Sequence, residues 1–412
     1  MKEGPIRIAV VGGGAAGMMA AAKALSLGAD VTLYEKNDRM GRKLAITGKG
    51  RCNVTNNCTA EDFFRNVPTN SRFLYSAYNS FTAQDTMAYF EGLGVPLKTE
   101  RGNRVFPVSD RAFDIVDALE KQVRGHIVRR RVTELVTEDG RVCGVRTGNT
   151  LHPCDAVIVC TGGLSYPRTG SDGDGLRFAE DLGLEVVPPK PSLVPMESPD
   201  RFCAAMQGLS LKNTALRVER EDGRIVYTDF GEMMFTHFGV TGPMILSASS
   251  MIPDLVPGKY RLLLDLKPAL TEKELDHRIL SDFSQNQNRD FANALGALLP
   301  AKMIPVVVAR SGIAPTKKVN TVTKEERKAL VALLKAFSVR LSGFRPIDEA
   351  IITKGGVSVK ELNPKTMACK TIPGLFFAGE IIDVDAYTGG FNLQIAFCTA
   401  ICAAEGACYS LS

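Results

Sequence analysis

The sequence predicts an α/β fold: a Rossmann-like domain interrupted by an inserted antiparallel β-barrel domain that carries a helical subdomain. Three observations predict it. A mostly apolar run, a glycine-rich turn and an alanine-rich helix follow one another in residues 6–25. Short alternating strands and then helical patterns fill the middle of the chain, and a strand that ends in Ala-Gly-Glu returns near residue 380. With 412 residues, 45% of them apolar, the chain can form two or three domains with cores.

The first turn has the pattern Gly-x-Gly-x-x-Gly over residues 12–17. In a strand-turn-helix unit, Gly12 permits the tight turn, Gly14 lets a pyrophosphate approach the main chain, and Gly17 lets helix and strand pack closely. Glu35 follows the next apolar strand, where an acidic side chain accepts hydrogen bonds from ribose hydroxyls. The order of these elements favours a dinucleotide site over an ordinary glycine-rich turn.

Residues 37–57 combine five basic residues with three glycines and four asparagines. The segment is too glycine-rich for a good helix, and a flexible surface loop is one interpretation. It follows the ribose-binding strand, however, at the edge of the sheet where ligands bind in doubly wound folds. Its amides, Lys and Arg side chains are suitable donors for phosphates and ring carbonyls. We therefore favour ligand binding.

Further along, helices are expected at 61–92 and 110–123, and an antiparallel hairpin at 127–137 and 141–146. The buried strand 156–160 runs into Thr161-Gly162-Gly163, which again brings backbone close to a ligand. Asp174 is a candidate N-cap of the next helix.

The composition changes near the Pro-Pro-Lys-Pro segment at 188–191, where we place the first domain boundary. Alternating strands in 192–267 predict a β barrel or sandwich, and capping boxes at Thr271 and Thr323 predict helices. The resulting division is a discontinuous first domain (1–190 and 352–412), a barrel (191–268 and 340–351) and a helical subdomain (269–339).

The C-terminal part completes the first domain. A strand ends at Gly379-Glu380, and a glycine-rich turn then leads into an apolar helix at 395–407. Such a turn would supply an acid for a ribityl hydroxyl, and amides for phosphate or flavin carbonyls.

Composition excludes several classes of protein. No apolar run reaches the roughly 18 residues of a membrane span, and the first apolar stretch belongs to the fold, so we expect a cytoplasmic protein without a signal peptide. The ten cysteines form no Cys-x-x-Cys pair and no metal-ligand spacing with histidine, so we expect no metal site. Cys398 and Cys402 are expected to pack in the core. Five residues lie between Cys52 and Cys58, one more than in flavin disulfide reductases, and a redox disulfide is the less favoured interpretation. The formal charge of +5 is too mild to indicate nucleic acid by itself.

These motifs together resemble the FAD-binding oxidoreductases of the two-dinucleotide-binding-domain superfamily. More closely, the chain is similar to the family that includes YhiN, BaiN and the aminoacetone oxidase-like proteins, over nearly its whole length. The most specific match is Gly-Lys-Gly-Arg-Cys-Asn at 48–53, supported by Phe-Thr-His-Phe-Gly at 235–239 and Gly-Gly-Phe-Asn-Leu-Gln at 389–394. The resemblance implies FAD in the terminal domain and an inserted barrel with a helical cap, and it implies no single reaction.

The residues that we expect to bind FAD are Gly12, Gly14, Ala15, Ala16, Gly17, Glu35, Lys36, Gly41, Arg42, Lys43, Thr47, Gly48, Gly50, Arg51, Cys52, Asn53, Val132, Thr161, Gly162, Gly163, Gly379, Glu380, Asp385, Gly390, Phe391, Asn392, Leu393 and Gln394.

Three residues are candidates for catalysis. The resemblance places His237 over the flavin, where an imidazole could transfer a proton; a structural histidine is an equal alternative. Tyr387 could act as an acid or as a steric wall, or be a packed aromatic, and Arg168 could hold a substrate carboxylate. Lys49, Arg51 or the helix that starts near Asn392 could stabilise negative charge on the flavin.

We therefore expect an FAD-dependent oxidoreductase that acts on a small or flat organic substrate, by enone reduction or amine oxidation. No second strand-linked Gly-x-Gly-x-x-Gly is apparent, so NADH or NADPH would bind only transiently as reductant. Alternatives are an amine oxidase that releases hydrogen peroxide, and a flavin-loaded redox sensor or nucleic-acid-associated protein, although nucleic acid is the less expected partner.

Overall fold

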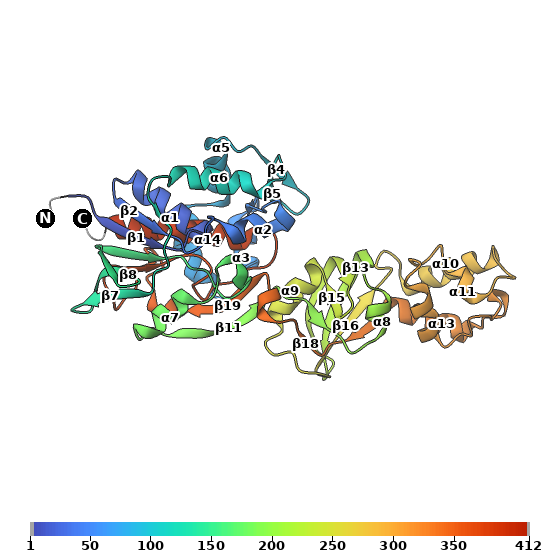
Figure 1. The fold of residues 1–412 in the computed structure, drawn as a ribbon. Coiled ribbons are helices and arrows are strands. Elements are labelled where there is room, and N and C mark those ends of the chain that lie inside the picture. The colour runs from blue at the N-terminus through green and yellow to red at the C-terminus, as the bar shows by residue number, and fades with distance from the viewer. Residues whose placement is uncertain (1–3, 410–412) are drawn as a thin grey trace. The chain divides into compact units, whose positions relative to one another are not determined.

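The computed structural model describes residues 4–409, and the chain divides into two compact units (Figure 1). Unit 1 contains the described residues up to Ser192 and those from Ile347 onward, and unit 2 is Leu193–Pro346. Unit 1 is therefore built from both ends of the chain, and unit 2 from one continuous segment between them.

A five-stranded parallel sheet forms the centre of unit 1. In pairing order its strands are β20 (Leu375–Phe377), β10 (Ala156–Val159), β1 (Arg7–Val11), β2 (Asp30–Tyr34) and β6 (Ile127–Val128). β1 and β10 are almost wholly apolar and buried, as expected for strands covered on both faces. Helix α1 (Ala15–Ser26) packs against α6 (Ala112–Gln122) and α14 (Phe391–Tyr409). The Rossmann-like fold is confirmed.

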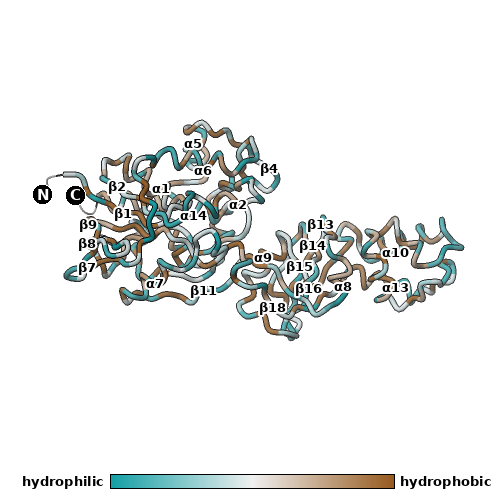
Figure 2. The backbone as a smooth tube through the Cα atoms, in the orientation of Figure 1, coloured by the Kyte–Doolittle hydropathy of each residue, from teal (hydrophilic) through white to brown (hydrophobic). Residues whose placement is uncertain are grey.

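Helix α14 is long and apolar enough to cross a membrane by length and composition. However, 83% of its most apolar window is buried inside the protein, against α1, α4 (Tyr75–Ser80) and the central sheet. Figure 2 colours the backbone by hydropathy, with hydrophobic residues in brown and hydrophilic residues in teal. Its burial therefore marks α14 as a core helix of unit 1.

Smaller elements surround the central sheet. The two three-stranded antiparallel sheets are β3 (Thr55–Asn56), β5 (Arg104–Pro107) and β4 (Leu97–Glu100), and β7 (Glu134–Glu138), β8 (Arg141–Thr147) and β9 (Thr150–Pro153). A two-stranded ribbon pairs β11 (Val186–Ser192) with β19 (Ile352–Val357). The remaining α-helices of unit 1 are α2 (Arg42–Gly50), α3 (Ala60–Arg65), α5 (Ala83–Gly92) and α7 (Asp174–Asp181).

Two predicted elements are interrupted. The helical region expected at 61–92 is broken into α3, α4 and α5, because Pro68 and the left-handed Asn70 (φ 54°) lie between the first two helices. The hairpin expected from residue 127 begins only at Glu134, since Ile127 and Val128 pair in parallel with Leu33 and Tyr34. The helix expected at 110–123 is observed as α6.

Unit 2 contains a seven-stranded antiparallel sheet. In pairing order its strands are β17 (Phe337–Arg340), β16 (Tyr260–Asp265), β13 (Ser210–Arg220), β14 (Ile225–Phe235), β15 (Gly239–Thr241), β12 (Met196–Glu197) and β18 (Gly343–Phe344). This pairing runs in open order from β17 to β18, so a closed barrel stays a prediction.

The helices of unit 2 are α8 (Phe202–Ala205), α9 (Pro243–Met251), α10 (Glu272–Ser284), α11 (Phe291–Ala294), α12 (Ile304–Ser311) and α13 (Lys324–Lys335). The capping boxes of Thr271 and Thr323 both form, at the starts of α10 and α13. The four helices α10 to α13 lie in the chain between β16 and β17, and their separation as a subdomain stays a prediction.

Candidate dinucleotide site in unit 1

The glycines of the first turn have three different surroundings. Gly12 has a φ of 106°, and a Cβ there would lie 2.6 Å from the carbonyl oxygen of Cys160. A Cβ on Gly17 would lie 1.7 Å from the carbonyl oxygen of Gly12, so these two glycines are required by the protein itself. A Cβ on Gly14, the N-cap of α1, would meet no atom within 4 Å. The protein leaves open space at Gly14, where a dinucleotide site needs it.

Glu35 braces this turn. Its Oε2 accepts a 2.8 Å hydrogen bond from the backbone N–H of Gly13, and its Oε1 accepts bonds from the backbone and side-chain nitrogens of Asn37. Asn37 also donates to the carbonyl oxygen of Thr169, so it links Glu35 to the segment after β10. The carboxylate is 8% exposed and lies beside the glycine turn, as the ribose-binding acid of such folds does.

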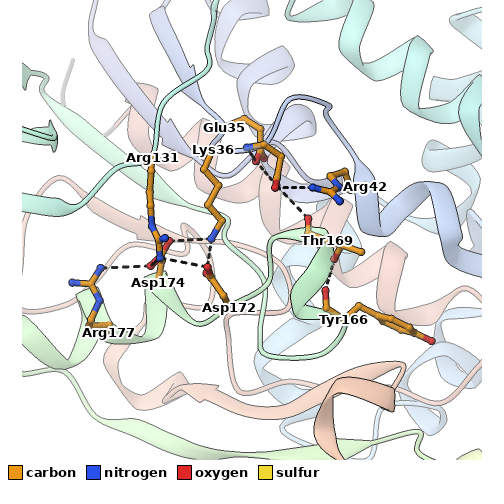
Figure 3. A network of polar contacts seen from close by, with 10 residues as sticks. Glu35, Lys36, Arg42, Arg131, Tyr166, Thr169, Asp172, Asp174 and Arg177 are labelled. Carbon is orange, nitrogen blue, oxygen red and sulfur yellow. Dashed lines mark hydrogen bonds and ion pairs between the residues drawn. The ribbon is translucent and has the colours of Figure 1, made fainter.

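Lys36 belongs to an ionic network rather than to an open surface. It pairs with Asp172 and Asp174, and Arg131 and Arg177 also pair with Asp174 (Figure 3). Burial disfavours the charged Asp174 carboxylate, but hydrogen bonds from Arg131 and Lys36 outweigh it and lower its pKa. The predicted N-cap role of Asp174 is wrong, because Gly173 is the N-cap and Asp174 is the first helical residue.

The basic segment is partly helical, which corrects the expectation that it would form no helix. It contains α2, whose regular geometry is interrupted at Thr47, Gly48 and Lys49. Lys49 and Cys52 have left-handed φ values of 60° and 59°. Such strained positions cluster at ligand sites. The glycine content predicted no helix, whereas the structure has a helix that is interrupted near its C-terminal end.

Arg51 fixes this segment to the small sheet. Its guanidinium pairs with Glu100 and Asp110 and lies 4.1 Å from the ring centroid of Phe106. Lys98 pairs with the same two carboxylates, so Arg51 anchors the loop within a cluster of four charged side chains, and its role in stabilising charge on a flavin stays a prediction. Lys49 is exposed.

Lys43 and Glu380 connect α2 to the end of β20. Lys43 Nζ lies 2.6 Å from Glu380 Oε2 and donates a hydrogen bond to the hydroxyl of Ser165. Glu380 Oε1 accepts bonds from the Ser165 hydroxyl and the backbone N–H of Thr353. Both carboxylate oxygens thus already have protein partners, so Glu380 organises the site from four separate segments of unit 1.

Three buried side-chain atoms in the described residues have no hydrogen-bond partner: Asn53 Oδ1, Thr161 Oγ1 and Asp385 Oδ1. They belong to three separate segments of the predicted cofactor site: the loop after α2, the end of β10 and the turn before α14. Asp385 is 1% exposed. Buried polar atoms rarely go without a partner, so these three mark places where a ligand would satisfy the protein.

The C-terminal turn meets the first turn. A Cβ on Gly379 would lie 2.9 Å from Cβ of Ala16, and one on Gly390 would lie 2.3 Å from the carbonyl oxygen of Thr55. The side chains of Asn392 and Gln394 form hydrogen bonds within unit 1. Asn392 bonds the backbone of Ala386, while buried Gln394 bonds Thr55, Thr86 and Phe81.

The other predicted cofactor residues lie at these same segments. Ala15 and Ala16 begin α1, Gly41 is the left-handed N-cap of α2, and Arg42 bonds Asn37. Thr47, Gly48 and Gly50 lie in α2, and Gly162 and Gly163 follow β10. Cys52, Val132 and Phe391 are buried in the core, and Leu393 packs against it.

The three catalytic candidates are divided between the two units. Tyr387 lies in unit 1, where its backbone N–H bonds the carbonyl oxygen of Asn66, and Arg168 is exposed in a 3-10 turn. His237 is exposed in the turn between β14 and β15 of unit 2 and contacts Phe238. Its placement over a flavin stays a prediction.

Nine of the ten cysteines are buried. All ten cysteines are free thiols, and burial raises the pKa of Cys52 to about 12 and that of Cys58 to about 11. Cys398 and Cys402 are buried on α14. Across residues 4–409, no group of three or more His, Cys, Asp or Glu side chains could hold a metal ion.

Sequence reasoning missed several residues of the site. Asn37, Ser165, Ser192 and Thr353 hold the predicted acids by hydrogen bonds. Only the role of Asn37 could have been predicted from the sequence, because it lies two residues after Glu35. The others act across more than 25 positions of sequence, which no spacing rule reveals.

Comparison with known proteins agrees with this geometry. The model of the HI0933-like protein Rossmann domain matches residues 6–406. A ribosomal RNA dihydrouridine synthase of Haemophilus influenzae is 28% identical over 95% of this chain and 96% of its own. A 3-dehydro-bile acid delta(4,6)-reductase of Clostridium scindens is 28% identical over 97% and 98%. A solved 3-ketosteroid delta1-dehydrogenase of Sterolibacterium denitrificans shares the fold, with a TM-score of 0.51, 14% identity, and coverage of 98% of this chain and 99% of that one. The chain therefore belongs to the HI0933-like family, the flavoprotein family that its motifs resemble.

Proposed function

We propose that this protein is an FAD-dependent reductase that saturates a carbon–carbon double bond conjugated to a carbonyl group. The observation that carries the cofactor assignment is the set of three unpartnered buried atoms of Asn53, Thr161 and Asp385 in three of the predicted FAD segments. The open space at Gly14 supports it.

The donor and acceptor chemistry of these residues fits FAD. Asp385 Oδ1 and Asn53 Oδ1 are acceptors, and they need hydrogen-bond donors such as ribityl hydroxyls or the flavin N3–H. The N-terminus of α1 supplies amides and a positive dipole end for the pyrophosphate, and Glu35 accepts from ribose. When bound, FAD supplies hydride transfer at its N5 atom.

The choice of reaction is supported by what two relatives share. One is named for forming dihydrouridine, which is uridine saturated at the double bond beside its C4 carbonyl; the other is named as a delta(4,6)-reductase of a 3-dehydro (keto) bile acid. In both cases the substrate gains a hydride at one carbon and a proton at the other. We propose NADH or NADPH as the source of the electrons, and His237 or Tyr387 as the source of the proton, with Arg168 as a contact for an anionic substrate. We expect this chemistry in the cytoplasm.

A uridine in RNA is a second candidate substrate, because the charge is unevenly divided. Unit 2 contains 21 Lys and Arg and 16 Asp and Glu, against totals of 50 and 45. Unit 2 thus carries a formal +5, while unit 1, with 29 of each sign, carries none. The net positive charge of the sequence therefore belongs to unit 2, and a basic unit suits a polyanion.

The test begins with the purified protein, which should be yellow or take up added FAD; a protein that does neither contradicts the proposal. Anaerobic mixing with NADH or NADPH should bleach the flavin, and a conjugated enone or a uridine-containing RNA should restore its colour. Restoration by RNA that weakens steeply with salt would select RNA. Peroxide formed in proportion to an added amine would select the amine oxidase instead.

A further inference from the structure

Asp385 and Ser192 form a buried pair at the end of the β11–β19 ribbon. The Ser192 hydroxyl donates a 2.9 Å hydrogen bond to Asp385 Oδ2, and both residues are at most 1% exposed. The second carboxylate oxygen, Oδ1, has no partner. One carboxylate therefore bonds the ribbon through one oxygen and offers the other to a ligand.

The pair lies where the chain passes between the units. Ser192 is the last residue of β11 and of the first segment of unit 1, and the next residue, Leu193, has a left-handed φ of 54°. Ser192 pairs with Ile352, which lies five residues after the chain re-enters unit 1 at Ile347. Both crossings of the chain are thus within a few residues of the ribbon end that Ser192 anchors.

We propose that Asp385 couples occupancy of the cofactor site to the order of this ribbon end. The inference rests on the proposed function, in which FAD lies against Asp385. Ser192 holds the carboxylate in place for the ligand, and a ligand donor on Oδ1 in turn favours the arrangement in which Ser192 is bonded. Because binding free energies are linked reciprocally, each contact strengthens the other by the same factor.

The neighbouring groups favour such a device. Asp383 lies beside Asp385 and is held by the side chain of Asn70, and burial raises its pKa. A second carboxylate nearby makes the unliganded arrangement costly, since two like charges share one buried region. The other strand of the ribbon is tied separately, because Thr353 donates its backbone N–H to Glu380. Of the two ribbon strands, β11 is therefore the one whose end contacts Asp385. Its backbone amides should report whether the cofactor site is occupied.

Hydrogen exchange of the full-length protein, with and without FAD, tests the proposal. We expect FAD to slow exchange of residues 190–194 by about fivefold or more. In Ser192→Ala this slowing should vanish, and FAD affinity should fall by the same factor. The matched control is Ser358→Ala, a buried serine just beyond the other end of β19. It should behave as the wild-type protein.

The outcomes separate the two claims. Wild-type protein that binds no FAD contradicts the proposed function, and the coupling with it. FAD binding without slowed exchange at 190–194, or equal slowing in Ser192→Ala, overturns the coupling alone. Asp385→Asn should weaken FAD binding and abolish the slowing; should this variant not fold, Ser192→Ala decides the question.

Discussion

The backbone N–H of Gly13 donates to the carboxylate of Glu35 over 2.8 Å, which ties the end of β2 to the turn that opens α1. We expect Glu35→Ala to weaken FAD binding about tenfold or more, because hydrogen bonds to a charged group contribute roughly 1.5–3 kcal/mol. Glu35→Gln keeps one oxygen acceptor and should lose less. Titration of the apoprotein with FAD measures both, and an unchanged Kd in Glu35→Ala would remove its proposed role.

Gly14 and Gly17 should respond differently to alanine. Gly17→Ala places a Cβ against the backbone of Gly12, and we expect its free energy of unfolding to fall by roughly 1–3 kcal/mol or more. Gly14→Ala meets no protein atom, so the fold should keep its stability while FAD affinity drops. Denaturant unfolding of the apoprotein, together with FAD titration, distinguishes them. Equal FAD affinity in Gly14→Ala and wild type would argue against a pyrophosphate at this turn.

The Asp174 network predicts a pH dependence of stability. The pKa of Asp174 in the folded protein lies below the ordinary 3.8. The contribution of Asp174 to the free energy of unfolding is therefore present above pH 3.8, and it is lost as the pH falls through the pKa of the folded state. Asp174→Asn should therefore lower the free energy of unfolding at pH 7, by roughly 1.5–3 kcal/mol, and flatten its decline in acid. Asp181→Asn, on the same helix but in an exposed pair 3.6 Å apart, is the control. Identical acid profiles for the two variants would show that the network does not act this way.

The Arg51 clamp should act on FAD only through the loop that it holds. We expect Arg51→Gln and Glu100→Gln each to weaken FAD binding about two- to fivefold, as a partly exposed ion pair allows. The double variant should be no weaker than the weaker single variant, because both changes break the same contact. Additive losses would mean that Arg51 contacts the ligand directly.

Turnover of variants should show whether His237 or Tyr387 donates the proton to the substrate. We expect His237→Ala to lower turnover of a conjugated enone by about 10²–10⁴ while FAD remains bound, the range for loss of a general acid. His277→Ala, another exposed histidine of unit 2, should leave turnover unchanged. Wild-type rates in His237→Ala, with a large loss in Tyr387→Phe, would move the role to Tyr387.

Local patterns predicted the nucleotide unit well, because strand, turn, helix and acid lie within 30 residues around Gly12 and Glu35. The helix expected at 61–92 is broken beside Pro68, a signal that the sequence did offer, and at Asn70, whose left-handed conformation composition does not reveal. Arg131 pairs with Asp174 from 43 positions away. The contact of Asp385 with Ser192 spans 193 positions. Such pairings depend on the tertiary arrangement, which a single sequence does not encode locally.

The packing of α1 against α14 has a consequence for biosynthesis. The first helix of unit 1 cannot bury its face until the last helix has been made, whereas unit 2 is continuous and complete once residue 346 has left the ribosome. Unit 2 should therefore be able to fold before α14 has been synthesised, whereas the cofactor unit can complete its core only after α14 has been made. A nascent chain stalled before Phe391 would expose the apolar partner surface of α1 and bind no flavin.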